Sequence, residues 1–477
     1  MISIMKNMNL TQIAAACNGK IIGTYDSTQE IRGAVVDSRK VEKDFLFIAT
    51  VGERVDGHDY INTSFEHGAF AALCEKLPED AKGPCILVEN SFIALKQIAS
   101  YYRSQLDIKV VGITGSVGKT STKEFISSVL EQKYQVLKTE GNFNNEIGLP
   151  LTILKIKEHH EIAVLEMGIS DFGEMHRLSE IAKPDICVIT NIGQCHLENL
   201  GSREGILKAK SEIFDFMNEN GSICINGDDD MLSTLKEVKG ITPIRFGLHQ
   251  GNDAFANDLV THGLFGSSCN IHINKKLQEY TKDHYNDSHE FILPAEVPLP
   301  GEHMILNALA ATTVGILLHL TLDEIKDGIS AVKPVGGRSN IIKKERITLI
   351  DDCYNANPVS MKAAIDLLAQ ADTRKVAILG DMFELGEREK ELHYEVGNYA
   401  AEKVDVLICV GALSFHMHQG AIDASKASPS LNHIFYFETR DDMLSNIDHI
   451  LKEQDTVLIK ASHGMKFEDV VKYLESK

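Results

Sequence analysis

The sequence predicts an α/β protein built from three domains. Its 477 residues are enough for roughly three domains of ordinary size, and a hydrophobic content of 43% is ample for their cores. Short apolar runs alternate with helical patterns along most of the chain, which is typical of parallel sheets covered by helices. One glycine-rich segment, residues 112–121, lies between such a run and a helical pattern and indicates a phosphate-binding loop.

The amino-acid composition limits the kinds of partner that the protein can bind. The formal net charge of −20 argues against a broad surface for nucleic acid or an anionic membrane, because both need a basic face. The nine cysteines are scattered and odd in number, so we expect reduced thiols in a reducing cytosol. The N-terminus lacks the apolar core of a signal peptide, and no apolar run approaches the ~20 residues that cross a bilayer. We therefore expect a cytoplasmic monomer with small-molecule partners, no nucleic-acid partner and no integral membrane association.

Residues 1–105 form the first predicted domain, a small α/β unit of its own. Its expected elements are a helix at 10–16 opened by Thr11, a strand at 45–49, a helix at 61–68, a strand at 85–88 and a helix at 91–103. Two polar clusters, Asp37-Ser38-Arg39 and Asp56-Gly57-His58, stand between these elements, where their residue types also suit ordinary turns.

Residues 106–331 form the second predicted domain, which contains the glycine-rich segment. We expect strands at 162–167, 186–191 and 222–226, short antiparallel strands or loops at 245–300, and an apolar helix from 301. Ligands of parallel sheets gather at the carboxyl ends of the strands. Glu166, His196 and Asp228 lie at or just past such ends, so we expect them near the phosphate-binding loop.

Residues 332–477 form the third predicted domain, with the same alternation of strands and helices. We expect strands at 347–351, 375–379, 406–410, 433–437 and 456–460, and a last helix at 467–474. The region lacks a Gly-x-Gly-x-x-Gly pattern, so nothing in it favours a dinucleotide.

The glycine-rich segment reads Gly-Ile-Thr-Gly-Ser-Val-Gly-Lys-Thr-Ser from Gly112 to Ser121. Such a loop lets backbone N–H groups surround phosphate oxygens at a helix N-terminus, while Lys119 reaches the phosphates and Thr120 can bind Mg²⁺. Its spacing departs from the usual Gly-x4-Gly-Lys-Thr, and a simple glycine turn between a strand and a helix is the alternative. We expect the loop to bind ATP or GTP.

Three side chains are candidates for a metal site, and each has an ordinary alternative. Glu166 ends an apolar strand, where a carboxylate is costly unless it has a partner or a function. His196 fits equally well as a hydrogen-bonded loop residue, and Lys210 as a solvated helix lysine. The 19 histidines contain no His-Glu-x-x-His pattern, so no zinc site is expected.

A second polar cluster follows the strand expected at 347–351. Paired acids at a strand end, Asp351 and Asp352, suit a ribose hydroxyl or a metal, although the nearby Asn357-Pro358 also simply makes a turn. Arg338, after two glycines, can stabilise charge on a transferring phosphoryl group or lie on the surface.

Taken together, these motifs resemble the Mur ligase family, ATP-dependent amide-forming enzymes that build the peptide stem of bacterial peptidoglycan. The resemblance covers nearly the whole chain. It rests on the loop at 112–124, Leu-Glu-Met-Gly at 165–168, Asn-Ile-Gly at 191–193 with His196, Ala-Lys-Ser-Glu at 209–212, Asn307, Arg338 and Asp352. It implies a small N-terminal α/β domain for a UDP-linked substrate, a central parallel-sheet P-loop ATPase domain and a C-terminal Rossmann-like α/β domain.

Three segments are most similar to the branch of this family that adds D-alanyl-D-alanine. They are Gly-Asn-Phe-Asn-Asn-Glu-Ile-Gly-Leu-Pro-Leu-Thr at 141–152, Asp-Asp-Cys-Tyr-Asn-Ala-Asn-Pro-Val-Ser-Met at 351–361, and Gly-Asp-Met-Phe-Glu-Leu-Gly at 380–386. The implied reaction activates the carboxylate of UDP-MurNAc-tripeptide as an acyl phosphate and joins it to D-alanyl-D-alanine, in cytoplasmic peptidoglycan precursor synthesis. Another ligase of the family and a nucleotide-gated regulatory protein are the alternatives.

The resemblance also implies roles for single residues. ATP would be held by Gly115, Ser116, Gly118, Lys119, Thr120, Ser121, Asn307, Arg338 and Asp352. Two Mg²⁺ ions would be held by Thr120, Glu166, His196 and Lys210, the last as a carbamate, because an ammonium cannot bind a metal. The substrates would contact Ser38, Arg39, Asn142, Asn144, Asn145, Tyr354, Asn355 and Asn357. Lys119, Lys210 and His196 would be the catalytic residues.

Three positions depart from the family pattern. Met304 stands where the family usually has asparagine after the histidine at 303, which changes a polar contact near adenine. Ala461 and His463 stand where the family has glycine and arginine in a late Lys-Gly-Ser-Arg motif. His463 is not a permanent cation, and Ala461 restricts that turn.

Overall fold

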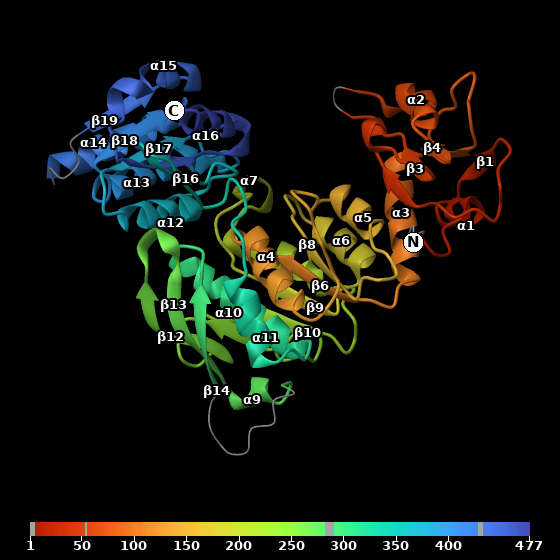
Figure 1. The fold of residues 1–477 in the computed structure, drawn as a ribbon, viewed down its shortest axis with the longest axis horizontal. Coiled ribbons are helices and arrows are strands. Elements are labelled where there is room, and N and C mark those ends of the chain that lie inside the picture. Colours follow the sequence, from red (N-terminus) through yellow and green to blue (C-terminus); the bar gives the residue numbers. More distant parts are fainter. Residues whose placement is uncertain (1–4, 53–54, 282–290, 428–432) are drawn as a thin grey trace. The chain divides into compact units, whose positions relative to one another are not determined.

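Three β-sheets with flanking helices make up the fold of the computed structural model (Figure 1). The structure describes residues 5–52, 55–281, 291–427 and 433–477. In this part of the chain the sheets contain five, nine and six strands, most of them parallel, so the predicted α/β class is confirmed. The chain divides into two compact units, one of residues 1–114, 133–188 and 210–223 and one of residues 115–132, 189–209 and 224–477. The domain boundaries at 105 and 331 stay predictions.

The first unit begins with the five-stranded sheet, in the order β1-β5-β4-β3-β2. Its strands are β1 (Lys20–Ile22), β2 (Gly33–Val35), β3 (Phe45–Ile48), β4 (Ala71–Cys74) and β5 (Cys85–Leu87), and its helices are α1 (Leu10–Ala16), α2 (Ile61–Glu66) and α3 (Ser91–Ser104). The predicted bounds of α1, residues 10–16, are confirmed, but the expectation that Thr11 opens the helix is wrong. Asn9 is the N-cap, because its side chain and that of Gln12 exchange hydrogen bonds with each other's backbone N–H groups.

The rest of the first unit contains parallel strands that lead toward the site. In it β6 (Lys109–Thr114) pairs with β8 (Ile162–Glu166), which also pairs with β7 (Val136–Lys138), and helices α5 (Gly148–Ile153) and α6 (Glu174–Ala182) belong to the same unit. Strand β9 (Ile186–Ile189) and helix α8 (Arg203–Ser211) cross from one unit to the other along the chain. The strands predicted at 162–167 and 186–191 are confirmed with earlier ends.

The second unit contains helix α4 (Lys119–Leu130), strands in the order β14-β13-β12-β11, and most of the neighbouring β10, which begins in the first unit. These are β10 (Ser222–Asn226), β11 (Ile244–Gly247), β12 (Ala254–Thr261), β13 (Ser267–Ile273) and β14 (Phe291–Val297). Strands β12 to β14 are antiparallel, as predicted for 245–300, although 282–290 lie outside the described residues. The apolar helix predicted from 301 is α10 (Glu302–Leu317), which packs on α4 beside α11 (Leu322–Ser330) (Figure 1).

The second unit also contains the six-stranded sheet, in the order β15-β16-β20-β17-β18-β19. Its strands are β15 (Asn340–Lys343), β16 (Thr348–Asp351), β17 (Lys375–Gly380), β18 (Val406–Val410), β19 (His433–Phe437) and β20 (Thr456–Lys460). Its helices are α12 (Pro358–Ala369), α13 (Glu389–Ala401), α14 (Ser414–Ala427), α15 (Arg440–Ile450) and α16 (Glu468–Glu475). All five predicted strands are confirmed. The sequence did not predict β15, an antiparallel strand at the edge of the sheet.

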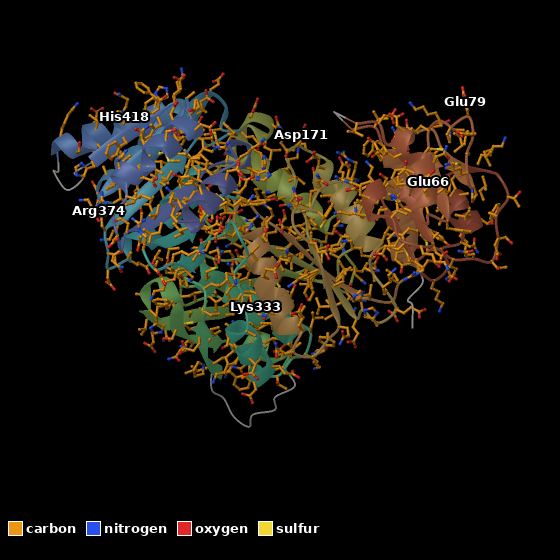
Figure 2. The ribbon with its side chains drawn as sticks, turned by 45° about the horizontal axis from the view of Figure 1, so that its top comes forward. Glu66, Glu79, Asp171, Lys333, Arg374 and His418 are labelled. Carbon is orange, nitrogen blue, oxygen red and sulfur yellow. The ribbon has the colours of Figure 1, made fainter. Side chains whose placement is uncertain are left out.

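The polar residues at the amino ends of the strands in this sheet differ in role from those at the carboxyl ends. At the amino ends of β17 and β20, the fully buried Asp455 carboxylate accepts hydrogen bonds from Arg374 Nη1 at 2.9 Å and from Lys452 N at 2.7 Å, which stabilises the fold. Arg374 is labelled in Figure 2. At the carboxyl ends of β16 and β20 lie Asp351 and Lys460, which belong to the candidate site.

All nine cysteines have free thiols, as the sequence predicts, and only Cys195 is not buried. Burial raises the pKa of the Cys269 thiol to about 11. Among the described residues, no helix is long and apolar enough to span a bilayer.

Helices α13 and α14 approach each other through glycines. A Cβ atom on Gly397 would lie 1.8 Å from the Met417 carbonyl oxygen, and one on Gly420 would lie 2.1 Å from the Tyr394 carbonyl oxygen.

Gly397→Ala is therefore expected to destabilise the protein by about 1–3 kcal/mol, since the two helices must separate. Urea unfolding followed by circular dichroism measures this. Gly336→Ala, where a Cβ meets nothing within 4 Å, is the control, and equal unfolding midpoints would contradict the packing argument.

Candidate active site

The phosphate loop joins the end of β6 to the start of α4. Gly115 has φ +152° and Gly118 has φ +83°, and both values favour glycine. Gly118 is the N-cap of α4, and no side chain of the described residues caps the helix there, so its first N–H groups face the loop. Lys119 Nζ donates to the Gly115 carbonyl oxygen at 2.9 Å and lies across the loop. The alternative of a simple glycine turn does not account for this lysine.

Thr190 and Asn191, the two residues that directly follow β9, form hydrogen bonds with the phosphate loop. Thr190 Oγ1 donates to the Val117 carbonyl oxygen at 2.7 Å, and Asn191 Nδ2 donates to the same oxygen at 3.0 Å. Asn191 Oδ1 also accepts a hydrogen bond from Val117 N at 2.9 Å. A Cβ atom on Gly115 would lie 2.0 Å from Thr190 Oγ1, so the strand end and the loop are in tight contact. Asn191 was noted only as part of a motif, and Thr190 was missed because a threonine after a strand is an ordinary residue.

The turn after Asn191 is held to the loop and to an acid. Gly193 N donates to Ser116 Oγ, and Ile192 N donates to Asp229 Oδ2, both at 2.8 Å. The neighbouring Asp228, which we expected near the loop, instead accepts a hydrogen bond from Asn252 Nδ2 at 2.9 Å. The acid that reaches the site is therefore Asp229, one residue later.

Asn307 lies beside the loop, as predicted. Its Oδ1 accepts a hydrogen bond from Thr122 Oγ1 at 2.7 Å, and a Cβ atom on Gly118 would lie 3.7 Å from the same oxygen. Its Nδ2 lies 3.4 Å from the sulfur of Met304, which is buried. The departure at Met304 thus places a weak sulfur acceptor next to the asparagine.

The paired acids after β16 fix the turn that carries Arg338. Asp351 Oδ2 accepts a hydrogen bond from Gly337 N at 2.8 Å, and Asp352 Oδ1 accepts one from Ser339 N at 2.9 Å. The Arg338 guanidinium lies over the ring of Tyr354, 4.1 Å from its centroid. Arg338, Asp352 and Tyr354, predicted separately for phosphate, ribose and substrate, are therefore neighbours.

Lys460 joins this cluster from β20. Its Nζ donates to Asp352 Oδ2 at 2.7 Å and to the Asn355 carbonyl oxygen at 2.9 Å, and the side chain is buried. His463 lies near Tyr354, with 5.5 Å between the ring centroids. Burial lowers the pKa of His303, which also feels the charges of Asp352 and Lys460. The role of Lys460 was missed, because a lysine that ends a strand is usually solvated.

Glu166 and Asn144 lie together in the first unit. Glu166 is almost fully buried at the end of β8, and its Oε1 accepts a hydrogen bond from Asn144 Nδ2 at 2.8 Å. The Asn144 carbonyl oxygen accepts one from Gly168 N at 2.8 Å. A predicted metal residue and a predicted substrate residue are thus in direct contact. Lys210 on α8 is fully buried, so the alternative of a solvated lysine is wrong.

His196 has an unusual backbone and a carboxylate partner. Its φ is +56°, and its Nδ1 donates to Glu384 Oε2 at 2.8 Å. This hydrogen bond lowers the pKa of Glu384 below its ordinary value.

Thr120, at the start of α4, is buried. Within the described residues, no group of three or more His, Cys, Asp or Glu side chains is already arranged as a metal site.

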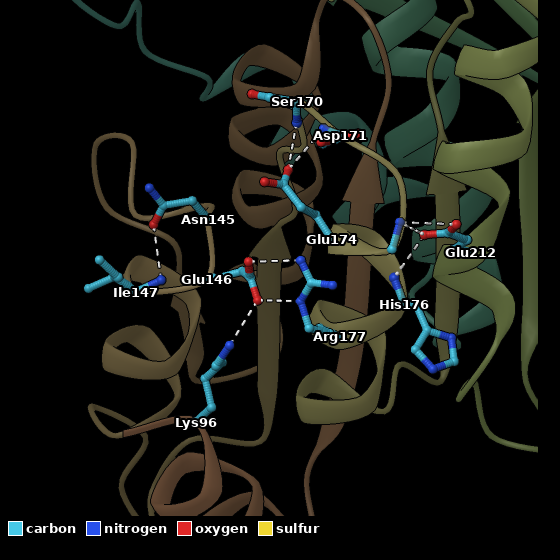
Figure 3. Close-up of polar contacts among 11 residues, drawn as sticks. Lys96, Asn145, Glu146, Ile147, Ser170, Asp171, Glu174, His176, Arg177 and Glu212 are labelled. Carbon is cyan, nitrogen blue, oxygen red and sulfur yellow. Dashed lines mark hydrogen bonds and ion pairs between the residues drawn. The ribbon is translucent and has the colours of Figure 1, made fainter. Parts of the chain in front are cut away.

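An ion-pair cluster forms around Glu146, next to Asn145, in the segment 142–146 (Figure 3). Arg177 Nε and Lys96 Nζ meet Glu146 Oε1 at 2.6 and 3.0 Å, which ties the segment to α6 and α3. Asn145 Oδ1 accepts hydrogen bonds from the backbone at the start of α5, so that side chain is used locally.

Glu212 performs a similar task for α6 (Figure 3). Its Oε2 accepts hydrogen bonds from Gly173 N at 3.1 Å and from His176 N at 3.2 Å, where a carboxylate suits the positive end of a helix. The Ala-Lys-Ser-Glu motif at 209–212 therefore combines a buried lysine with a helix cap.

Arg39 of the first sheet region is exposed and paired with an acid. It extends from a short 3₁₀ turn (Ser38–Lys40) with 85% of its side chain exposed, and Asp37 accepts hydrogen bonds from its Nε at 2.9 Å and its Nη2 at 2.8 Å. The Asp56-Gly57-His58 motif is structural by contrast. Nδ1 of the buried His58 lies 2.6 Å from Asp56 Oδ1, and its Nε2 accepts a hydrogen bond from Glu75 N.

The remaining predicted substrate residues have mixed environments. Asn142 is exposed. The Asn355 side chain accepts a hydrogen bond from Ala356 N at 2.9 Å. Asn357 caps α12 through a reciprocal pair of hydrogen bonds with Ser360, so its side chain is engaged in folding.

A braced glycine loop at the carboxyl end of a parallel strand defines a nucleotide-binding α/β protein. Comparison with known families identifies which one. Models described as "Mur ligase family, catalytic domain", "Mur ligase middle domain" and "Mur ligase, glutamate ligase domain" match residues 30–110, 113–315 and 337–463. The chain belongs to the Mur ligase family.

Individual relatives agree over the full length. The chain is 37% identical over 476 residues to the UDP-N-acetylmuramoyl-tripeptide–D-alanyl-D-alanine ligase of Bacillus subtilis (strain 168), covering 98% of this chain and 99% of the relative. It resembles the crystal structure of MurF from Acinetobacter baumannii with a TM-score of 0.87 at 30% identity, over 99% and 100% of the two chains. The MurF ligase of Thermotoga maritima in complex with ADP matches with a TM-score of 0.77 at 30% identity, over 93% and 97%. The three-domain Mur ligase architecture expected from the sequence is confirmed.

Asn191→Ala is expected to weaken ADP binding by about tenfold, because the loop loses a donor and an acceptor worth roughly 1–2 kcal/mol together. Asn191→Asp should weaken it further, since a carboxylate oxygen would replace the amide donor to the Val117 carbonyl oxygen. Isothermal titration with ADP measures both. The control is Asn199→Ala, on the exposed face of α7 (Leu197–Leu200). Unchanged affinity in both Asn191 variants would show that the strand end does not shape the loop.

Proposed function

We propose that this protein is an ATP-dependent ligase that joins D-alanyl-D-alanine to UDP-MurNAc-tripeptide through an acyl phosphate. The observation that carries the proposal is the braced phosphate loop with Asn307, Arg338 and Asp352, in a chain whose relatives with this named activity match it over nearly its full length. The setting is the synthesis of peptidoglycan precursors in the cytoplasm, and the protein acts as a monomer.

The residues that we assign to the nucleotide offset the negative charge of its phosphates. We assign the triphosphate to the N–H groups of Gly115 to Ser121 and to Lys119, since the tripeptide carboxylate and the γ-phosphate otherwise repel each other. Asn307 takes the adenine end, Asp352 the ribose and Arg338 a phosphate. The stacking of Arg338 on Tyr354 directs the guanidinium before ATP arrives.

The donor set fits Mg²⁺. Thr120 offers a hydroxyl and Glu166 a carboxylate, and such hard oxygen donors suit this ion. His196 adds an imidazole nitrogen. When bound, two Mg²⁺ ions would neutralise charge on the transferring phosphoryl group. A fully buried ammonium at Lys210 is costly, whereas a carbamate on the same nitrogen would supply oxygen donors and a negative charge. We therefore assign Lys210 as the carbamylated lysine.

We assign the substrate contacts residue by residue. We assign the UDP end to Ser38 and Arg39, the acyl chain to Asn142, Asn144 and Asn145, and the amine substrate to the segment Tyr354, Asn355 and Asn357. The bond between Asn144 and Glu166 supports this assignment, because it places the acyl segment against a metal ligand. Holding acid, nucleotide and amine together reduces the entropic barrier and keeps water from the acyl phosphate.

Phosphate release from ATP is expected to require both UDP-MurNAc-tripeptide and D-alanyl-D-alanine, because the acyl phosphate forms on one substrate and is consumed by the other. A coupled phosphate assay over the four combinations of the two substrates measures this. Release with neither substrate would favour a nucleotide switch, and full activity with a different amine would favour another ligase of the family.

Lys210→Ala is expected to lower the ligase rate by at least about a hundredfold, the upper range for metal-site changes, and added bicarbonate should not restore it. Lys208→Ala, two residues earlier on the exposed side of α8, is the matched control and should keep its rate. Mass spectrometry at mildly alkaline pH looks for the added carbon dioxide. Wild-type activity in Lys210→Ala would rule out the carbamate.

A further inference from the structure

The contact between His196 and Glu384 joins a metal candidate to a segment far along the chain. The Nδ1 and Oε2 atoms are 2.8 Å apart. A carboxylate only accepts, so the shared hydrogen belongs to Nδ1, and the neutral ring then keeps its lone pair on Nε2. The contact therefore selects the tautomer in which Nε2 is the nitrogen able to bind a metal.

The backbone on both sides of this contact is unusual. His196 has φ +56° and Glu384 has φ +62°, although neither is glycine. A positive φ is strained for a residue other than glycine, and it persists only where the surrounding structure holds it. The two chain segments lie side by side here, since a Cβ atom on Gly386 would be 3.7 Å from the Cα atom of Glu198.

The segment that presents Glu384 is anchored to the six-stranded sheet. Met382 N donates to Nε2 of the buried His393, and Phe383 N donates to Ser462 Oγ, both at 2.9 Å. Ser462 N in turn donates to the Asp381 carbonyl oxygen at 3.0 Å. Three residues in a row are thus tied down just before Glu384, so its position follows that of the sheet.

We propose that Glu384 is a positioning residue that orients His196 for Mg²⁺. This inference rests on the proposed function, in which His196 is a metal ligand. A carboxylate behind a ligating histidine fixes the ring and raises its basicity, and its loss typically costs 10–100-fold in metal affinity. Glu384 is held by contacts with the six-stranded sheet and His196 follows β9, so the orienting contact joins two segments that are far apart in the sequence.

The test uses Mn²⁺ as a paramagnetic probe with the full-length protein and ADP, and electron paramagnetic resonance measures the free ion. Glu384→Ala is expected to weaken Mn²⁺ binding about 10–100-fold. Glu384→Gln should fall between it and the wild type, because the amide oxygen still accepts from Nδ1 without the charge. The exposed Glu387→Ala is the matched control and should bind Mn²⁺ as the wild type does. In the ligase assay, the Mg²⁺ concentration for half-maximal rate should rise while the KM for D-alanyl-D-alanine stays the same.

His196→Ala separates this inference from the proposed function. If His196→Ala binds Mn²⁺ as tightly as the wild type, the metal assignment itself is wrong. If His196→Ala weakens binding and Glu384→Ala does not, the positioning role of Glu384 is overturned. Thermal unfolding of each variant checks that it is folded.

Discussion

The site depends on the contact between the phosphate loop and the end of β9. The Asn191 side chain accepts a hydrogen bond from Val117 N and donates one to Val117 O. A single side chain therefore satisfies both backbone polar groups of Val117, a residue of the loop. Gly115 must lack a side chain for Thr190 to approach. This close approach explains why a glycine stands at position 115 of the loop. Strand β9, three strands later in the chain and next to β6 in the sheet, leads into the residues that determine where the phosphate-binding N–H groups point.

The sequence predicted most of the fold because strand and helix patterns here are strongly periodic. The strands β10, β18, β19 and β20 have the expected limits. Edge strands such as β15 and the three-residue β1, β2 and β7 were not predicted, since short half-exposed runs carry little periodicity. The bounds of α1 were predicted, but Thr11 rather than Asn9 was expected to open the helix, because both residue types suit a cap and only the hydrogen bonds with Gln12 distinguish them.

Individual site residues could be predicted from motifs, but their partners could not. Asn144 and Glu166 were assigned to different tasks, and only the folded chain brings them within 2.8 Å. Lys460 opens one motif noted in the sequence and Thr190 directly precedes another, but neither motif indicates which groups these side chains bind, so their contributions follow from tertiary contacts alone. His58 and Asn357 show the reverse case, in which a conspicuous polar residue forms hydrogen bonds that stabilise the fold.

The turn at 337–339 has a thermodynamic consequence. Asp351 and Asp352 hold the N–H groups on either side of Arg338, and Tyr354 holds its guanidinium. A free arginine loses up to about 2 kcal/mol of rotamer entropy when a ligand immobilises it. Here much of that loss is incurred during folding rather than during binding. Such preorganisation lets a single cation contribute more of its attraction for phosphate to nucleotide affinity.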